Sequence, residues 1–209
     1  MEKGLTGKFI TFEGAEGSGK STQAALACRY LEEKKARVLH IREPGGVKIS
    51  EAIRRILLNV KNTGMSDACE MLLYMAARSQ LIEEVILPEL RKGTTVLCDR
   101  YLDSTLAYQG YGNGVDLKII KEIGTFATRD LTPDLTLLFD IDTQKGFSRM
   151  GREKDRIEMR ALGYHTRVRK GYLQMAQKEP QRFRVIQGDK SKEEIFQTVK
   201  TCLDQLLGF

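Results

Sequence analysis

Short apolar runs alternate with longer amphipathic stretches along this chain. Five short, mostly apolar runs predict buried strands at 8–13, 37–41, 94–99, 134–140 and 183–186. Apolar residues at helical spacing predict helices between them, at about 20–35, 50–58, 67–92, 116–128, 144–150, 160–177 and 192–207. Strands and helices that alternate in this way form a parallel sheet with helices on both faces. The pattern therefore predicts an α/β fold of three layers with a five-stranded parallel sheet, in one domain over 1–209.

A glycine-rich turn joins the first predicted strand to the first predicted helix, and it fits the pattern G-x-x-x-x-G-K-[ST]. Its glycines let backbone N–H groups converge on phosphate oxygens, and the following helix points its positive end at the anion. Lys20 adds a charge at the β- and γ-phosphates, and Ser21 offers a hydroxyl to Mg²⁺. The predicted nucleotide-binding residues are Gly14, Ala15, Glu16, Gly17, Ser18, Gly19, Lys20, Ser21 and Thr22.

The third predicted strand ends in an acidic residue, Asp99. A carboxylate at this position of a phosphate-binding α/β protein organises the Mg²⁺ shell. Many strands end in an Asp that is only a turn residue. The glycine-rich turn at 14–21 is the feature that favours a metal role for Asp99. Arg100 follows at the carboxyl end of the sheet, where ligands of open α/β sheets bind.

The net charge of +6 is concentrated in one part of the chain. Between Arg149 and Arg184 basic residues exceed acidic ones by seven, so the rest is close to neutral. A solvated helix face explains most of these charges. A nucleic-acid surface is disfavoured because aromatic residues do not alternate with the basic ones, and a role beside bound phosphate is the third interpretation.

Composition excludes several classes of protein. Hydrophobic residues make up 41% and charged residues 30%, and no apolar run approaches the length of a membrane span. The first residues lack the apolar stretch of a secretion signal. The four cysteines are scattered without a Cys-x-x-Cys pair, which argues against zinc and disulfides and suits a reducing compartment. We therefore expect a cytoplasmic protein that binds neither membrane nor nucleic acid.

Further motifs follow the glycine-rich turn in a fixed order. They lie at 12–14 (Phe-Glu-Gly), 42–46 (Arg-Glu-Pro-Gly-Gly), 72–78, 99–101 (Asp-Arg-Tyr), 104–110, 133–136 and 155–158 (Asp-Arg-Ile-Glu). From about residue 8 to 189 this ordered set resembles the thymidylate kinase family. The resemblance implies a P-loop nucleoside monophosphate kinase fold, phosphorylation of dTMP to dTDP by ATP with Mg²⁺, and a homodimer.

The resemblance also implies roles by position. At the base of dTMP, Tyr74 would stack on thymine, Arg78 would bind its carbonyl edge, and Thr105 and Gln109 would approach the ring. At the sugar, Tyr108 would pack beneath the deoxyribose and Glu16 would face the 3′-hydroxyl. Arg54 and Arg100 would hold the phosphate. The implied metal residues are Ser21, Asp99 and Glu13. Spacing alone puts Tyr74 and Arg78 on one helix face, but a core tyrosine and a surface arginine would show the same spacing.

The stretch 149–160 resembles the lid of the family's bacterial type. The glycine-rich turn contains no cation between Ala15 and Ser18, so the positive charge on the transferred phosphoryl group is expected from elsewhere. We predict that Arg149 or Arg152 supplies it and that Arg156 braces the closed lid or binds donor phosphates.

The predicted catalytic set is therefore Lys20, Arg100, Arg149 and Arg152. An acceptor-binding region at about 43–80 and the lid are predicted to be mobile. Another nucleoside monophosphate kinase and a P-loop NTPase that acts with nucleic acid are the alternative functions. An inactive relative is disfavoured because Lys20, Asp99 and Arg100 are all present.

Overall fold

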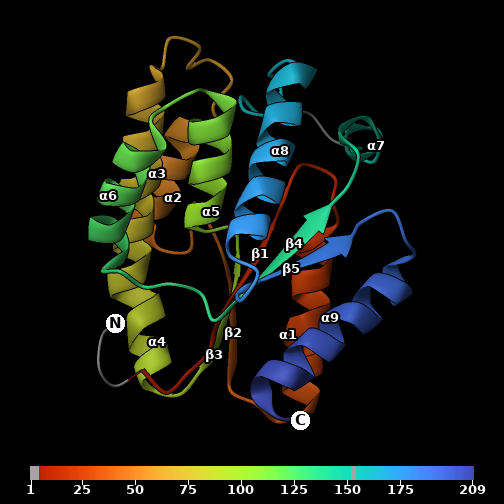
Figure 1. The fold of residues 1–209 in the computed structure, drawn as a ribbon. Coiled ribbons are helices and arrows are strands. Elements are labelled where there is room, and N and C mark those ends of the chain that lie inside the picture. The colour runs from red at the N-terminus through yellow and green to blue at the C-terminus, as the bar shows by residue number, and fades with distance from the viewer. Residues whose placement is uncertain (1–4, 152–153) are drawn as a thin grey trace.

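Five parallel strands form the central layer of the protein (Figure 1). In the computed structural model, which describes residues 5–151 and 154–209, the strand order is β2-β3-β1-β4-β5. The strands are β1 (Phe9–Gly14), β2 (Val38–Arg42), β3 (Thr95–Asp99), β4 (Leu135–Asp140) and β5 (Phe183–Gln187). Every pair of neighbours is parallel. The predicted α/β fold with a five-stranded parallel sheet is confirmed, and each strand end lies within one residue of its predicted place.

Helices cover both faces of this sheet. They are α1 (Lys20–Glu33), α2 (Lys48–Leu58), α3 (Asp67–Leu81), α4 (Leu87–Arg91), α5 (Leu102–Thr105), α6 (Leu117–Thr128), α7 (Thr143–Ser148), α8 (Leu162–Lys178) and α9 (Lys192–Leu207), with π-helical segments η1 (Ile82–Ile86) and η2 (Leu106–Gly112). On one face, α1 and α9 lie together and bury Ala24, Leu31 and Val199 against the sheet (Figure 1). The other face carries α3, η1, α4 and α8.

The helical segment α5–η2 has no counterpart among the predicted helices. Its sequence contains Gly110 and Gly112, and glycine is the poorest helix former after proline. Both glycines allow close packing. A Cβ at Gly110 would lie 2.4 Å from Leu117 Cδ2, and a Cβ at Gly112 would lie 2.5 Å from Tyr164 Cε2. Tertiary contacts with α6 and α8 therefore make a helix where local propensity favours a loop.

The sheet brings the glycine-rich turn and Asp99 together. Phe12 of β1 is in register with Asp99 of β3, so the turn after β1 and the residues after β3 leave the sheet side by side.

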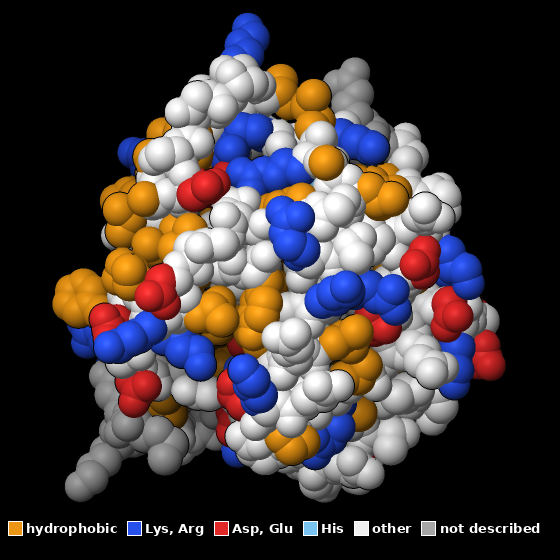
Figure 2. All heavy atoms as spheres, turned by 45° about the horizontal axis from the view of Figure 1, so that its top comes forward, with side chains coloured by type: hydrophobic (Ala, Val, Ile, Leu, Met, Phe, Trp, Pro, Cys, Tyr) orange, Lys and Arg blue, Asp and Glu red, His pale blue; other side chains and the backbone are white. Residues whose placement is uncertain are grey.

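Across 5–151 and 154–209 no helix has the length and hydropathy that crossing a membrane requires. Figure 2, which brings the upper end of Figure 1 forward, shows more Lys and Arg than Asp and Glu side chains on that face.

Candidate active site

The glycine-rich turn, here called the P-loop, forms the wall of a cavity of about 380 Å³, here called the P-loop cavity. Gly14 and Gly17 have φ angles of 146° and 68°, which L side chains rarely adopt. A Cβ at Gly17 would lie 1.9 Å from the Gly146 carbonyl oxygen, so only glycine fits where the turn meets α7. Of the ten residues predicted to bind ATP, the nine of the turn and Arg156, seven line this cavity, namely Glu16, Gly17, Ser18, Gly19, Lys20, Ser21 and Thr22.

A second cavity of about 200 Å³, here called the acceptor cavity, lies between the sheet and α2, α3 and η2. Among its lining residues are seven of the eight predicted to bind dTMP, namely Glu16, Arg54, Tyr74, Arg100, Thr105, Tyr108 and Gln109. The two cavities share Glu16, Lys20, Ser21 and Glu158. Two phosphorylated ligands, one in each cavity, would therefore meet with their phosphates at Lys20.

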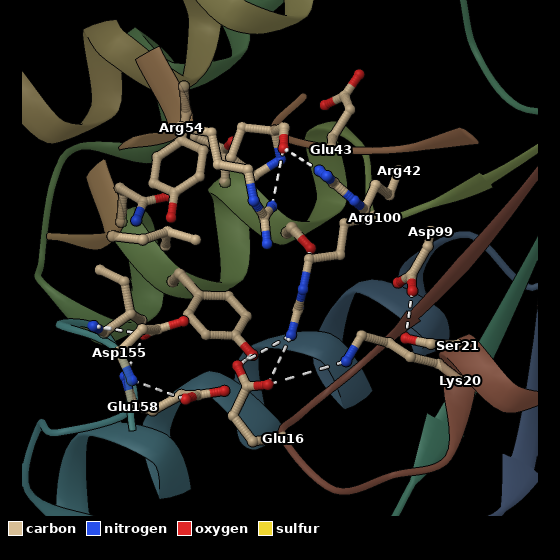
Figure 3. A pocket seen from close by; sticks show the side chains of 18 residues that line it. Glu16, Lys20, Ser21, Arg42, Glu43, Arg54, Asp99, Arg100, Asp155 and Glu158 are labelled. Carbon is tan, nitrogen blue, oxygen red and sulfur yellow. Dashed lines mark hydrogen bonds and ion pairs between the residues drawn. The ribbon is translucent and has the colours of Figure 1, made fainter. Parts of the chain in front are cut away.

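Arg100 and Glu16 form the electrostatic centre of this junction (Figure 3). Arg100 Nη2 donates to Glu16 Oε1 at 2.9 Å and to Oε2 at 3.0 Å, and Lys20 Nζ lies 3.9 Å from Oε2. The Tyr108 hydroxyl donates to Glu16 Oε1 at 2.6 Å. Burial alone would raise the pKa of Glu16, but Arg100 and Lys20 lower it to about 2. Glu16 is therefore an anion that offsets two neighbouring cations.

Glu13 holds the backbone on which Arg100 is mounted. Arg100 has a φ of 73°, in the left-handed region that strains a non-glycine residue. The next N–H, that of Tyr101, donates to Glu13 Oε1 at 2.7 Å, and the hydroxyls of Ser104 and Tyr172 donate to Oε2 at 2.6 and 2.7 Å. The Glu13 side chain thus fixes the turn that aims the Arg100 guanidinium into the acceptor cavity.

Comparison with known proteins identifies the family. A sequence model described as thymidylate kinase matches residues 12–199. The chain belongs to the thymidylate kinase family. A thymidylate kinase of Carboxydothermus hydrogenoformans is 50% identical over 206 residues, which cover 98% of this chain and 100% of that protein. A thymidylate kinase of Bacillus velezensis is 42% identical over 207 residues, with 97% and 98% covered.

A solved structure of the same family has the same fold. The crystal structure of thymidylate kinase from Ehrlichia chaffeensis superposes with a TM-score of 0.78 at 34% identity, covering 94% of this chain and 98% of that one. The P-loop nucleoside monophosphate kinase fold implied by the resemblance is therefore confirmed.

The residues predicted to hold a metal ion separate into two groups. Ser21 Oγ donates to Asp99 Oδ2, and the buried Asp99 Oδ1 has no hydrogen-bond partner among the residues that the structure describes. An unpartnered carboxylate oxygen beside the P-loop hydroxyl fits Mg²⁺, which usually takes one or two protein carboxylates and completes its shell with substrate phosphates and water. Glu13 lines neither cavity, and its oxygens are occupied by three donors. Its metal role stays a prediction that this geometry does not favour.

Arg78 is the predicted dTMP residue that does not line the acceptor cavity. It is 1% exposed, and its Nε donates to Glu43 Oε2 at 2.7 Å. It also donates to the Tyr101 carbonyl at 2.9 Å, to Thr105 Oγ1 at 3.1 Å and to Met75 Sδ at 3.3 Å. Arg78 therefore holds Thr105 and the backbone after β3 from behind, and its contact with the base stays a prediction.

The lid arginines lie in different surroundings. Arg149 is exposed, lines the P-loop cavity and donates from Nη1 to the Gly188 carbonyl at 2.7 Å. Arg152 lies outside the described residues. Arg156 lines neither cavity and is buried, with Nε donating to the Leu57 carbonyl at 2.7 Å. This contact ties the lid to the end of α2. The bracing role of Arg156 and its part in ATP binding remain predictions.

Several functional positions carried no predicted role. Asp155 and Glu158 line the acceptor cavity and come from the Asp-Arg-Ile-Glu motif, so the motif itself was the available signal. Tyr172, whose hydroxyl lies 3.4 Å from Arg100 Nη1, gave no signal beyond helical spacing. The same holds for Glu70, which is fully buried on α3.

Proposed function

We propose that this chain transfers the γ-phosphoryl group of ATP to dTMP, giving dTDP and ADP. The observation that supports this most directly is the pair of cavities that share Lys20 and Glu16, one walled by the P-loop and one lined by Tyr74 and Tyr108. ATP would lie in the first and dTMP in the second. This arrangement agrees with membership of the thymidylate kinase family.

Catalysis by these residues consists of alignment and charge neutralisation. The acceptor is itself a phosphate anion, so no histidine or cysteine nucleophile is required. Arg100 and Arg54 would hold this phosphate, and Tyr74 would stack on the thymine ring. Lys20 would stabilise charge on the transferred group, and Arg149 or Arg152 would close over it.

Mg²⁺ is the cofactor in this proposal. Ser21 and Asp99 would hold it, and the unpartnered Oδ1 of Asp99 is the observation in favour. Within 5–151 and 154–209 no three His, Cys, Asp or Glu side chains cluster as metal ligands, so most of the ion's ligands would come from nucleotide and water. The ion, when bound, neutralises charge on the β- and γ-phosphates.

An ADP-release assay with ATP, Mg²⁺ and one nucleoside monophosphate at a time tests this function. We expect dTMP to be preferred strongly over dCMP, AMP and GMP, and dUMP to be accepted less well than dTMP. Transfer to AMP or GMP instead would support another monophosphate kinase. Hydrolysis that depends on DNA or RNA, without transfer to dTMP, would support the nucleic-acid-associated alternative.

We also propose that two copies associate through α3 and α6, which lie side by side in Figure 1. Ile119 and Phe126 are seven residues apart on one face of α6 and are 47% and 86% exposed. On the neighbouring α3, Leu72 is 50% exposed. Burial of these side chains favours a homodimer. Sedimentation equilibrium tests it, since Phe126→Glu should shift a dimeric protein toward monomer.

Two further features belong to the proposal. The four cysteines are all unpaired, which favours the cytoplasm as the place of action. The region 43–80 and the lid at 149–160 contribute walls to the cavities and would move to admit ligands. Hydrogen exchange in both segments should slow when ADP and dTMP bind, and unchanged exchange would contradict the motion.

A further inference from the structure

A fully buried carboxylate lies behind the acceptor cavity. Glu70, on the first turn of α3, is 0% exposed and is not part of the cavity wall. Its Oε2 accepts from Arg156 Nη2 at 2.5 Å and from Arg160 Nη2 at 2.7 Å. Its Oε1 accepts from Gln109 Nε2 at 2.8 Å and from Asn113 Nδ2 at 3.2 Å. One carboxylate therefore connects α3, η2 and the C-terminal part of the lid.

The contact with Gln109 fixes the orientation of an amide that lines the cavity. An ionised carboxylate only accepts hydrogen bonds, and two guanidinium groups pair with this one. Gln109 must therefore turn its NH₂ group to Glu70, which leaves Oε1 as the polar atom available to a ligand. None of the described residues donates to that oxygen. The acceptor cavity thus presents a fixed hydrogen-bond acceptor from η2.

We propose that Glu70 is a positioning residue that sets pyrimidine specificity by holding the Gln109 carbonyl oxygen toward the bound base. The inference rests on the proposed function and adds to it the residue that orients the base-reading amide. A pyrimidine with a ring N–H between two carbonyls, as in thymine, donates to this oxygen. Cytosine carries a lone pair on the same ring nitrogen, so two acceptors would face each other without a proton.

Glu70→Gln tests the orientation, because a glutamine at 70 offers either an N–H or an oxygen to Gln109. The Gln109 amide is then free to turn over and present its NH₂ group to the base. We expect the ratio of kcat/KM for dTMP to that for dCMP to fall about tenfold or more. Dissociation constants of dTMP and dCMP, measured by calorimetry without ATP, should show the same loss of discrimination.

Arg160→Gln is the matched control. It removes another partner of Glu70, from a side chain 21% exposed, and leaves the Gln109 contact in place. A purely structural role for Glu70 predicts that both variants change stability or turnover alike. The proposed role predicts that the dTMP/dCMP ratio falls for Glu70→Gln and stays at the wild-type value for Arg160→Gln.

A double-mutant cycle completes the test. Gln109→Leu should lower the ratio by itself, and adding Glu70→Gln to it should change the ratio no further. If Glu70→Gln does not fold, Gln109→Leu and the Arg160→Gln control decide. A wild-type ratio in folded Glu70→Gln or in Gln109→Leu overturns the inference. Absence of any transfer to dTMP by the wild type would instead refute the proposed function, and calorimetry would still report the base preference.

Discussion

Glu13→Gln should change how the stability of this protein depends on pH. Burial, together with the charge of Asp103, raises the pKa of Glu13 from 4.5 to about 7, although its hydroxyl partners and Arg100 act in the opposite direction. Glutamine keeps the shape of the side chain. Its Oε1 can still accept from the Tyr101 N–H, and its NH₂ group can donate to the hydroxyls of Ser104 and Tyr172, which can rotate to accept.

The sign and size of the effect follow from linkage. The folded protein holds the Glu13 proton more tightly than the unfolded chain does, so protonation stabilises the native state. This contribution is fully present below pH 4.5 and is lost as the pH rises through about 7. One pKa unit corresponds to about 1.4 kcal/mol, so about 2 to 3 kcal/mol should disappear between roughly pH 5 and pH 8. Glutamine does not titrate and loses nothing.

Urea unfolding of the wild type and Glu13→Gln without nucleotide or metal measures the difference across this pH range. His40 and His165 titrate alike in both proteins, so their effects cancel. Relative to wild type, Glu13→Gln should gain about 2 to 3 kcal/mol of unfolding free energy from pH 5 to pH 8. Glu33→Gln, a change at an exposed position of α1, is the control and should leave the pH profile unchanged. Parallel profiles for wild type and Glu13→Gln would refute the argument.

Three more substitutions test other parts of the site. Lys20→Ala should lower kcat by about 10³-fold or more without unfolding the chain. Near-normal turnover of the folded variant would refute the role of the P-loop in phosphoryl transfer. Arg149→Ala and Arg152→Ala, made singly and together, should show a large fall in kcat with a smaller change in KM for at least one, whereas wild-type kcat in the double variant would exclude the lid as the source of charge. Arg78→Met leaves Glu43 buried without its cation and should cost about 3–5 kcal/mol of unfolding free energy by urea titration, and a cost well below 1 kcal/mol would contradict the structural role.

The fold was predictable because its signals are local. Each strand is a short apolar run, and the glycine-rich turn combines a strand, a spacing and a helix within about 25 residues of sequence. The segment α5–η2 was not predictable, because Gly110 and Gly112 weaken a helix locally while side chains from α6 and α8 require them. That requirement exists only in the folded protein.

The sequence motifs indicated which residues gather around the cavities, but not how deeply each side chain is buried. The lining of the acceptor cavity agrees with the predicted positions for Tyr74, Thr105 and Gln109. An arginine that contacts the base and one that forms a buried ion pair with Glu43 would have the same helical spacing. The sequence position of Arg78 therefore could not distinguish the two roles. Buried pairs such as Arg78 and Glu43 lie tens of residues apart in the sequence. A hydrogen bond between them produces no periodic pattern from which it could be predicted.

The charge balance at the cavity junction is the physical reason for the prediction that a lid arginine supplies the catalytic charge. Lys20 is buried, and burial and the adjacent Arg100 both lower its pKa, so a further cation inside the turn would weaken the two already there. Glu16 offsets both, and it engages Arg100 through both of its oxygens. A cation for the transferred phosphoryl group must then approach from outside the turn, after the nucleotide has brought its own negative charge. Arg149 already lines the P-loop cavity, and its bond to the Gly188 carbonyl is one that an exposed arginine exchanges at a cost of about 1 kcal/mol. A charge recruited from a lid would therefore separate two requirements that conflict within the turn, a stable empty site and a strongly positive occupied one.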